Sequence, residues 1–408
     1  MTAGVVRTYQ MFARLEAHGR SPAYEALAAA AAADPGIVSF IASLPAAKRQ
    51  PNLLFAAARY LLDAPASIGS LRALVRDRPA ELAAVMRARR TQTNEPARCA
   101  VLLPALAQLP EPLALVDVGA SAGLTMLFDR YSYDYGGRRL AGADPDAPTL
   151  RCQVAGPAPL PDRIPAIVWR IGLDLNPLDV TVDDDVRWLS CLVWPDEEDR
   201  AERLAAAIAS ARRAPPSVIR GDLLTDLPAV VAGAPADATV VVYHSSVLCY
   251  VTPSQREQFA RTVGGLDVTW LTSESPGDVP GTARPSRDGH MTVLARDGRP
   301  LALADSHGTR LQWLGLSSGQ NVTAGLRSDQ VPACGGRRSE EATMRFGTLL
   351  LVIWLLIGVA AAGQRGYYDG SIGSCTKVGT IAVTIITGPL NYLGVNPKID
   401  CTAPKPSR

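Results

Sequence analysis

The sequence predicts an α/β protein in three parts: an N-terminal all-α cap, a parallel sheet closed by an antiparallel hairpin, and a C-terminal transmembrane helix. Three observations lead to this prediction. Residues 1–108 carry apolar residues at helical spacing, short β-rich runs alternate with helical ones from about residue 113, and an uncharged apolar run fills residues 346–363. A hydrophobic content of 47% and a net charge of +2 are typical of a folded globular chain.

The cap is predicted over residues 1–108. Its helical segments are separated by Pro or Gly and read "VVRTYQMFARLEAHG", "PAYEALAAAAAA", "NLLFAAARYLLD", "LRALVRDRPAELAAVMRARR" and "RCAVLLPALAQL". We expect this region to serve packing and to carry no chemistry of its own.

The sheet is predicted over residues 109–333. Its strands are expected in "LALVDVG", "AIVWRIGLDLNP", "PSVIRGD" and "ATVVVYHSSVLCYV", each followed by a helix, the first helix being "SAGLTMLFDRY". A fifth strand is expected in "DVTWLTSE". Two further strands flank Asp297-Gly298, a hairpin signal. Residues 131–165, rich in Tyr, Gly and Pro, form an insertion that is either an extra hairpin or lid, or the place of the true second strand.

The loop after the first strand has the spacing Asp117-x-Gly119-x-Ser121-x-Gly123. Glycines between a strand and a helix gather backbone N–H groups and the positive end of the helix dipole, where a carboxylate or phosphate is stabilised. A dinucleotide fingerprint that starts at Gly119 would need glycine at Ser121 and Leu124. The loop is therefore expected to hold something other than a pyrophosphate.

This spacing resembles the first motif of the Rossmann-like S-adenosylmethionine-dependent methyltransferases, DxGxGxG, with Ser121 in place of the middle glycine. The closing hairpin is also a feature of that fold. The resemblance implies that the loop lies against the methionine part of the cofactor, that Asp174 in "GLDLNP" takes the ribose hydroxyls, and that Asp222 in "IRGDLL" lies near the adenine. Gly123 and Asp174 are 51 residues apart, whereas about twenty separate the two elements in related dinucleotide folds; the insertion accounts for the difference, or it displaces Asp174 from this role.

Across about residues 8–330 the chain also resembles an uncharacterised bacterial family, the domain-of-unknown-function 2332 family. The resemblance rests on "RSPAYEAL", "KRQPNLLFAAARYLL", "VDVGASAGLTMLFDRYSYDYGG", "RIGLDLNPLDV", "RWLSCLVWPDEEDR" and "ADSHGTRLQWL". It implies one unit of common architecture and leaves function to the residues.

Candidate catalytic residues follow the later strands, at the carboxyl edge of the predicted sheet. His244 ends an apolar strand and is the first candidate for a general base, Tyr250 is a candidate for positioning a substrate, and Glu274 ends the next strand. The alternative for His244 is a hydrogen-bonded structural histidine.

Other classes of function are disfavoured. No Lys- or Arg-rich tract is interleaved with aromatic residues, so we expect no nucleic-acid partner. Cysteine and histidine show no metal-ligand spacing, so we expect no metal. Residues 119–123, "GASAG", have the GxSxG spacing of a serine-hydrolase nucleophile elbow, but we interpret them as the ligand-binding loop described above and not as an elbow.

The C-terminal segment differs from the rest of the chain. Residues 1–343 hold one lysine and 34 arginines, as expected of a GC-rich bacterial coding sequence, whereas residues 344–408 hold three of each. After a linker at 334–343, the run 346–363 is 18 residues long, which is short for a transmembrane helix, and basic residues precede it. From Met344 the segment also has the layout of a secretory signal. We expect two reading frames joined near residue 343.

Together these observations predict a methyltransferase-like protein that uses S-adenosylmethionine and acts on a small molecule. Its body is expected in the cytoplasm, anchored to the cell membrane by a single pass with the C-terminus outside. The alternative is a pseudo-enzyme or binding protein that keeps the fold without catalysis.

Overall fold

The computed structural model describes residues 2–279, 282, 291–314, 354, 357, 359, 361–364 and 380–385. The chain divides into two units, Met1–Gly335 and Gly336–Arg408, and the architecture below is that of the first. The expected linker 334–343, most of the apolar run 346–363, Cys375 and Cys401 lie outside the described residues.

The N-terminal part is helical, as predicted. Its elements are α1 (Thr2–Met11), the π-helical turn η1 (Phe12–Ala17), α2 (Pro22–Ala33), α3 (Pro35–Ser43), the 3-10 turn η2 (Ala46–Lys48), α4 (Pro51–Leu62), α5 (Ile68–Asp77) and α6 (Pro79–Ala88). Proline opens α2, α3, α4 and α6, where its missing N–H costs no helical hydrogen bond. Ser21 and Asp34 cap α2 and α3 by accepting hydrogen bonds from the N–H groups of Tyr24 and Ile37.

The cap packs directly on the helices of the sheet region. Tyr24 and Phe55 of the cap lie in one aromatic cluster with Trp194, which follows α8 (Asp183–Leu192). Helix α4 also contacts α8 along its length. Buried residues of the cap and of the sheet region therefore form one hydrophobic core. The buried aromatic side chains make a large contribution to its stability.

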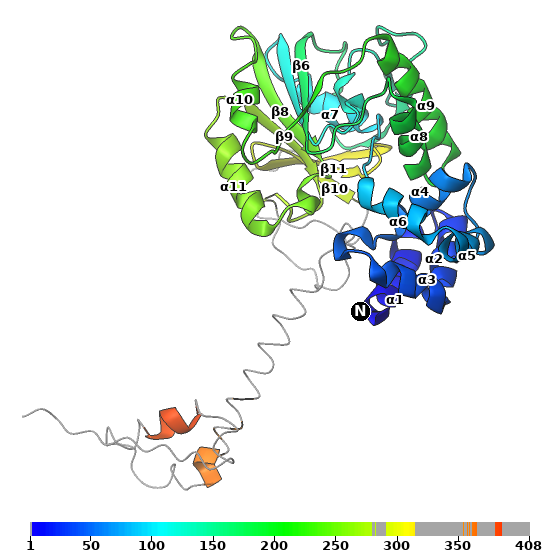
Figure 1. Cartoon of the computed structure of the whole chain (residues 1–408). Coiled ribbons are helices and arrows are strands. Elements are labelled where there is room, and N and C mark those ends of the chain that lie inside the picture. Colours follow the sequence, from blue (N-terminus) through cyan, green and yellow to red (C-terminus); the bar gives the residue numbers. More distant parts are fainter. Residues whose placement is uncertain are drawn as a thin grey trace, which may run out of the picture. The chain divides into compact units, whose positions relative to one another are not determined.

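The main sheet is mixed and runs in the order β5-β12-β11-β10-β9-β8-β1-β6-β7 among the described strands (Figure 1). Strands β7, β6, β1, β8 and β9 are parallel neighbours, and β10, β11 and β12 continue the sheet in antiparallel order. The bounds are β1 (Leu113–Val118), β5 (Gln153–Ala155), β6 (Ile167–Asp174), β7 (Val218–Arg220), β8 (Thr239–Ser245), β9 (Thr269–Glu274), β10 (Met291–Arg296), β11 (Arg299–Asp305) and β12 (Arg310–Trp313).

Helices cover both faces of the parallel part, with α8 and α9 (Glu198–Arg213) on one side and α10 (Leu227–Val231) and α11 (Pro253–Gly264) on the other (Figure 1). Side chains of β1 alternate between the two cores: Leu113 and Leu115 pack in the core shared with the cap, whereas Val116 and Val118 pack with α10 and α11. By the same alternation Asp117 faces the core shared with the cap. The central strand is buried throughout.

The prediction of a helix directly after β1 is wrong. Between Gly119 and Ser132, a stretch that is described throughout, the only helical element is the 3-10 turn η3 (Leu124–Met126). Nearly every apolar residue of this stretch is buried, so it lacks the solvent-facing side of an amphipathic helix. Tyrosine hydroxyls bond its carbonyls instead, Tyr131 to Leu124 and Tyr133 to Phe128.

The insertion does not displace the second strand, because β6 is the parallel neighbour of β1. Residues 131–165 instead form a small sheet of β3 (Arg139–Leu140), β2 (Ser132–Asp134) and β4 (Thr149–Arg151), and supply β5 to the far edge of the main sheet. Helix α7 (Arg98–Leu106), which is buried along its length, contacts β4, β9 and β10. Asp174 therefore ends the strand beside β1.

The closing hairpin is confirmed. Strands β10 and β11 are antiparallel and turn at Asp297-Gly298, where φ is 51° and 76°. Two left-handed residues suit the twist of a two-residue hairpin. Asp297 also accepts a hydrogen bond from the N–H of Trp270 in β9, which fixes the turn to the sheet.

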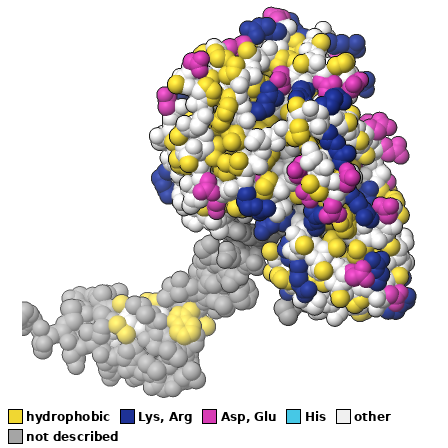
Figure 2. Space-filling view, turned by 45° about the horizontal axis from the view of Figure 1, so that its top comes forward, with side chains coloured by type: hydrophobic (Ala, Val, Ile, Leu, Met, Phe, Trp, Pro, Cys, Tyr) yellow, Lys and Arg dark blue, Asp and Glu magenta, His cyan; other side chains and the backbone are white. Residues whose placement is uncertain are grey.

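Of the described residues, none forms a single helix long and apolar enough to cross a membrane; α2 and α3 together have the length and composition but meet at 88°. On the face of the molecule in Figure 2, basic and acidic side chains are interspersed. Exposed ion pairs occur on the surface, one of them between Arg78 and Glu81.

Candidate functional site

The site predicted from the glycine loop lies at the carboxyl edge of β1. The chain passes from β1 to β6 on one side and later to β8 on the other, so the connections diverge at this edge. Crevices for ligands form at such switch points in open parallel sheets.

The loop from Gly119 to Gly123 takes left-handed backbone at alternate residues. The φ angles are 78° at Gly119, 53° at Ser121 and 71° at Gly123. Ser121 thus adopts the conformation that favours glycine, at the position where the methyltransferase motif has one. The backbone of Gly119, Ser121 and Gly123 is thus left-handed at all three positions, although Ser121 carries a side chain.

Gly119 is exposed, but one side of it is closely packed. A Cβ atom there would lie 2.4 Å from Cγ2 of Val247. At Gly123 a Cβ would lie 2.7 Å from the ring of Pro216. Both positions therefore require glycine for close approach as well as for their φ angles.

Two side chains hold the loop in place. Asp174 accepts a hydrogen bond from the N–H of Ser121 at 2.8 Å and, with its other oxygen, one from the N–H of Asn176 at 2.6 Å. Asn94, from the segment between α6 and α7, donates to Oγ of Ser121 at 2.7 Å and accepts from the N–H of Ala122 at 3.0 Å. The structure thus brings the predicted ribose acid into direct contact with the loop.

Asp117 is buried under the loop. It accepts a hydrogen bond from the hydroxyl of Thr125, whose carbonyl accepts one from Tyr243. Burial, which removes water from the carboxylate, raises the pKa of Asp117 to about 7, against the hydrogen bond from Thr125 that lowers it.

Asp222 lies farther from the loop than Asp174 does. It follows β7, which is separated from β1 by β6, and it accepts a hydrogen bond from the N–H of Leu224 at 2.8 Å. Its carboxylate is half-buried at the same edge of the sheet.

The structure brings His244 and Glu274 together but seals them from solvent. His244 is 0% exposed, and its Nδ1 lies 2.6 Å from Oε1 of Glu274, while Nε2 accepts a hydrogen bond from the indole N–H of Trp270 at 3.0 Å. Because Nε2 is an acceptor, the proton is on Nδ1 and is donated to the carboxylate. Both ring nitrogens are therefore used inside the core, which is the geometry of the structural alternative for His244.

Glu274 connects His244 to the turn beside the glycine loop. Its carboxylate also accepts from the N–H groups of Val247 and Leu248, at 2.9 and 3.3 Å. Tyr250 closes the same turn, the 3-10 element η4 (Leu248–Tyr250), and is 54% exposed. The three predicted catalytic residues thus surround one turn, with only Tyr250 at the surface.

The segment Asn94–Arg98, which we name the crossing segment, runs over the same edge of the sheet and was not predicted. Asn94 contacts the glycine loop. Arg98 donates from Nε to the carbonyl of Ser306 and from Nη1 to the carbonyl of Ser245, each at 3.0 Å. Between them the buried Glu95 accepts hydrogen bonds from two arginines of α9.

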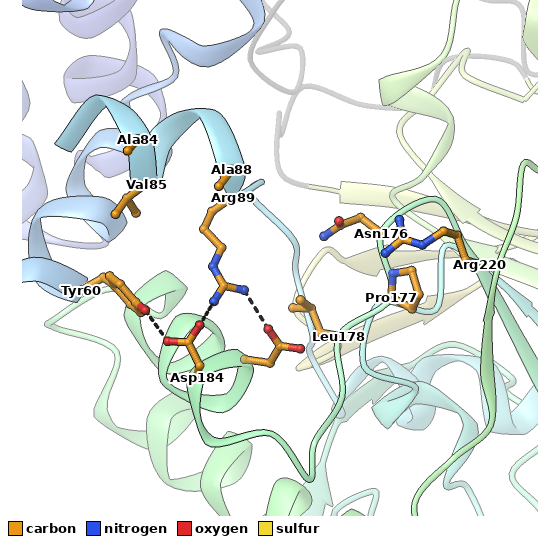
Figure 3. A pocket seen from close by; sticks show the side chains of 11 residues that line it. Tyr60, Ala84, Val85, Ala88, Arg89, Asn176, Pro177, Leu178, Asp184 and Arg220 are labelled. Carbon is orange, nitrogen blue, oxygen red and sulfur yellow. Dashed lines mark hydrogen bonds and ion pairs between the residues drawn. The ribbon is translucent and has the colours of Figure 1, made fainter. Parts of the chain in front are cut away.

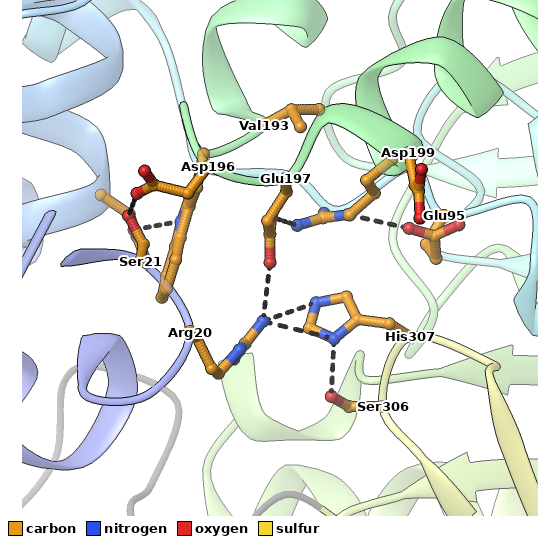
Figure 4. A network of polar contacts seen from close by, with 12 residues as sticks. Arg20, Ser21, Glu95, Val193, Asp196, Glu197, Asp199, Ser306 and His307 are labelled. Atoms are coloured by element: carbon orange, nitrogen blue, oxygen red, sulfur yellow. Dashed lines mark hydrogen bonds and ion pairs between the residues drawn. The ribbon is translucent and has the colours of Figure 1, made fainter. Parts of the chain in front are cut away.

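Several arginine side chains lie near Glu95 of the crossing segment and near His307. Arg200 and Arg203 pair with Glu95, and Arg20 reaches from the cap to Glu197 and the ring of His307 (Figure 4). Burial, with added repulsion from these guanidinium groups and from Arg98, holds the pKa of His307 far below its usual value, so His307 is neutral.

A cavity of about 580 Å³ lies between the cap and the loop after β6. Asn176, two residues beyond Asp174, lines the cavity on the side of this loop. Figure 3 shows Arg89 on its wall, paired with Asp184, which also bonds Tyr60. The volume is that of a small-molecule site, within the usual range of roughly 300–1,000 Å³. None of the predicted site residues lines it.

Nothing in the described residues groups three or more His, Cys, Asp or Glu side chains so as to hold a metal ion. Fold and site together define an α/β protein with a helical cap closed over the carboxyl edge of its parallel strands. The chain belongs to the family described as uncharacterized protein conserved in bacteria (DUF2332), whose model matches residues 6–313. No curated protein matches the chain.

Proposed function

We propose that the chain binds S-adenosylmethionine at the carboxyl edge of β1 and β6 and acts as a methyltransferase on a small molecule. The observation that carries the proposal is the Gly119–Gly123 loop, with three left-handed residues at the point where the strand order reverses. Asp174 ends the neighbouring strand and touches that loop. The parallel order β7-β6-β1-β8-β9 matches the 3-2-1-4-5 order of a Rossmann fold and supports the proposal.

The residues present fit such a cofactor in two respects. Gly119 is exposed and has no side chain, so a ligand can approach its backbone. Each oxygen of Asp174 accepts one backbone hydrogen bond and retains a lone pair for a ribose hydroxyl. Bound there, S-adenosylmethionine would supply an electrophilic methyl group, with Asp222 on the adenine side and Ser121 and Gly123 shaping the loop. Asp117 supports the loop from below.

His244 and Glu274 take a positioning role in this proposal. Through Glu274 they fix the N–H groups of Val247 and Leu248, and so the turn that faces Gly119. Tyr250, at the surface of that turn, is the residue placed to contact an acceptor.

The second candidate is a protein that binds a ligand without catalysis. The state of His244 favours it. Both ring nitrogens of His244 are hydrogen-bonded in the core, so neither nitrogen is free to accept a proton from a substrate.

Calorimetry of the full-length chain with S-adenosylmethionine and with S-adenosylhomocysteine tests the proposal. We expect both to bind, and Asp174→Asn to weaken binding by about 1–3 kcal/mol, because a charged acceptor is lost while one oxygen remains for the N–H of Ser121. Asp237→Asn, an exposed carboxylate before β8 at the opposite edge of the sheet, is the matched control.

Absence of binding by the folded wild-type chain would refute the proposal. Binding with no methyl transfer to any acceptor in a panel of small acids, alcohols and amines would select the second candidate.

A further inference from the structure

Arg98 is a buried cation with which no carboxylate of the described residues forms an ion pair. Its side chain is 7% exposed, and its two hydrogen bonds go to the backbone carbonyls of Ser245 and Ser306. Within the described part of the chain, its Nη2 has no acceptor and no ion pair involves it. Placing an unpaired charge in the interior is unfavourable by several kcal/mol. A largely buried guanidinium with an unbonded Nη2 is suited to bind an anion that the described residues do not provide.

The acids nearest to Arg98 are already engaged by other groups. Glu95 and Glu274 act on its pKa without an ion pair to it. Glu95 accepts from Arg200, Arg203 and the N–H of Ala97, whereas Glu274 accepts from His244 and two backbone N–H groups. Burial lowers the pKa of Arg98 and the charges of both carboxylates raise it, but neither carboxylate forms a hydrogen bond with its guanidinium.

Arg98 also lies at the level of the glycine loop. Asp117 of β1 pairs in parallel register with Tyr243 of β8, so Gly119 and Ser245 leave the sheet side by side. Because Arg98 donates to the carbonyl of Ser245, its guanidinium stands one strand away from the proposed cofactor loop. Tyr250 is close enough to act on the pKa of Arg98.

We propose that Arg98 forms the subsite for a carboxylate group of the small molecule on which the protein acts. The inference rests on the proposed function for the role of that molecule, but the subsite itself rests on Arg98. A monoanion fits better than a dianionic phosphate, because Nη2 is the one guanidinium nitrogen without a hydrogen bond among the described residues and the negative charges of Glu95 and Glu274 lie near it.

Thermal unfolding of the full-length chain tests the subsite with simple probes. We expect acetate and benzoate to raise Tm, and acetamide, benzamide and chloride at equal ionic strength to leave it unchanged, since a carboxylate alone pairs with Arg98. Arg98→Met should fold, because it removes a buried charge, and should weaken the apparent Kd for benzoate by about 10- to 100-fold.

Arg59→Met is the matched control. Arg59 also donates to backbone carbonyls, those of Cys191 and Val193, but it lies in the cap helix α4. This variant should keep the full benzoate effect. The subsite is refuted if neither carboxylate raises Tm, if Arg98→Met retains the effect, or if phosphate binds more tightly than benzoate.

The two proposals fail separately. If S-adenosylmethionine does not bind but the benzoate effect depends on Arg98, the subsite stands and the methyltransferase proposal falls. If S-adenosylmethionine binds and carboxylates have no effect, the subsite alone falls.

Discussion

At the scale of single residues, Asp117 is the group whose protonation is coupled most directly to the proposed site. Burial raises its pKa from 3.8 to about 7, so the unfolded chain loses this proton at lower pH than the folded chain does. Below about pH 4 Asp117 is protonated in both states and does not change the free energy of unfolding. As pH rises from about 4 to 7 the contribution of Asp117 lowers the free energy of unfolding, and above that range the reduction is constant.

We therefore expect Asp117→Asn to be more stable than the wild type at pH 8, by up to about 4 kcal/mol at 1.36 kcal/mol per pKa unit, and to lose most of this advantage near pH 4. The amide oxygen can still accept the bond from Thr125. Urea unfolding at pH 4, 6 and 8 measures the difference. The same difference at all three pH values would contradict the raised pKa.

Gly119 illustrates two separate demands on one residue, a left-handed backbone and close contact with Val247. Gly119→Ala should destabilise the fold by about 2 kcal/mol or more, because it adds both backbone strain and a clash. Gly136→Ala isolates the strain, since φ is 85° there and nothing lies within 4 Å of the new Cβ.

The double variant Gly119→Ala with Val247→Ala separates the clash. We expect it to be more stable than the sum of the single changes by about 1 kcal/mol or more, as measured by denaturant unfolding. Simple additivity would show that Val247 does not close on the loop.

How far the site could be predicted depends on whether its contacts are local in sequence. The loop spacing and the acid ending the next strand were accessible, because Asp117, Gly119, Gly123 and Asp174 lie at the ends of recognisable strands. Arg98 was not accessible, because its two acceptors are 147 and 208 residues away. Only the packed fold shows that a polar residue at the start of α7 enters the site.

At the scale of elements, the strands and the hairpin were predictable because short apolar, β-rich runs such as the fully buried β1 and the Asp297-Gly298 turn leave clear patterns. The helix after β1 was mispredicted because its apolar residues face buried surroundings on all sides, which spacing alone cannot distinguish from a helix. Residues 94–97 of the crossing segment left no pattern, since they have neither regular structure nor periodicity.

The crossing segment is anchored by Glu95, and this gives a prediction at the scale of that element. Glu95→Gln should destabilise the fold by about 2 kcal/mol or more, because the half-buried Arg203 would lose its carboxylate partner and Arg200 would keep only Glu197. Glu81→Gln breaks the exposed pair with Arg78 and should change stability little.

Denaturant unfolding compares the two glutamine variants directly. Equal effects would mean that the buried network contributes no more than a surface ion pair. If the segment also positions Arg98, Glu95→Gln should weaken benzoate binding, whereas Glu81→Gln should leave it unchanged.

At the scale of the whole molecule, the chain consists of a part that matches the DUF2332 family and a C-terminal segment of different composition. The family match ends at residue 313, the division into units falls at residues 335 and 336, and the change in lysine usage falls near residue 343. We propose that the second unit is a membrane anchor joined to a cytoplasmic body, with its C-terminus outside the cell.

Deletion of residues 344–408 tests this proposal. The first unit has its own core, so the truncated chain should stay folded and bind S-adenosylmethionine and benzoate as the full chain does. The full-length chain should sediment with membranes, because its run of 18 uncharged apolar residues reaches the lower limit for a spanning helix. Thiol labelling of intact cells should find Cys375 and Cys401 joined in a disulfide, since both would face the oxidising side. A full-length chain found wholly in the soluble fraction, or a body that unfolds without its tail, would overturn the anchor and leave residues 344–408 as part of the folded body.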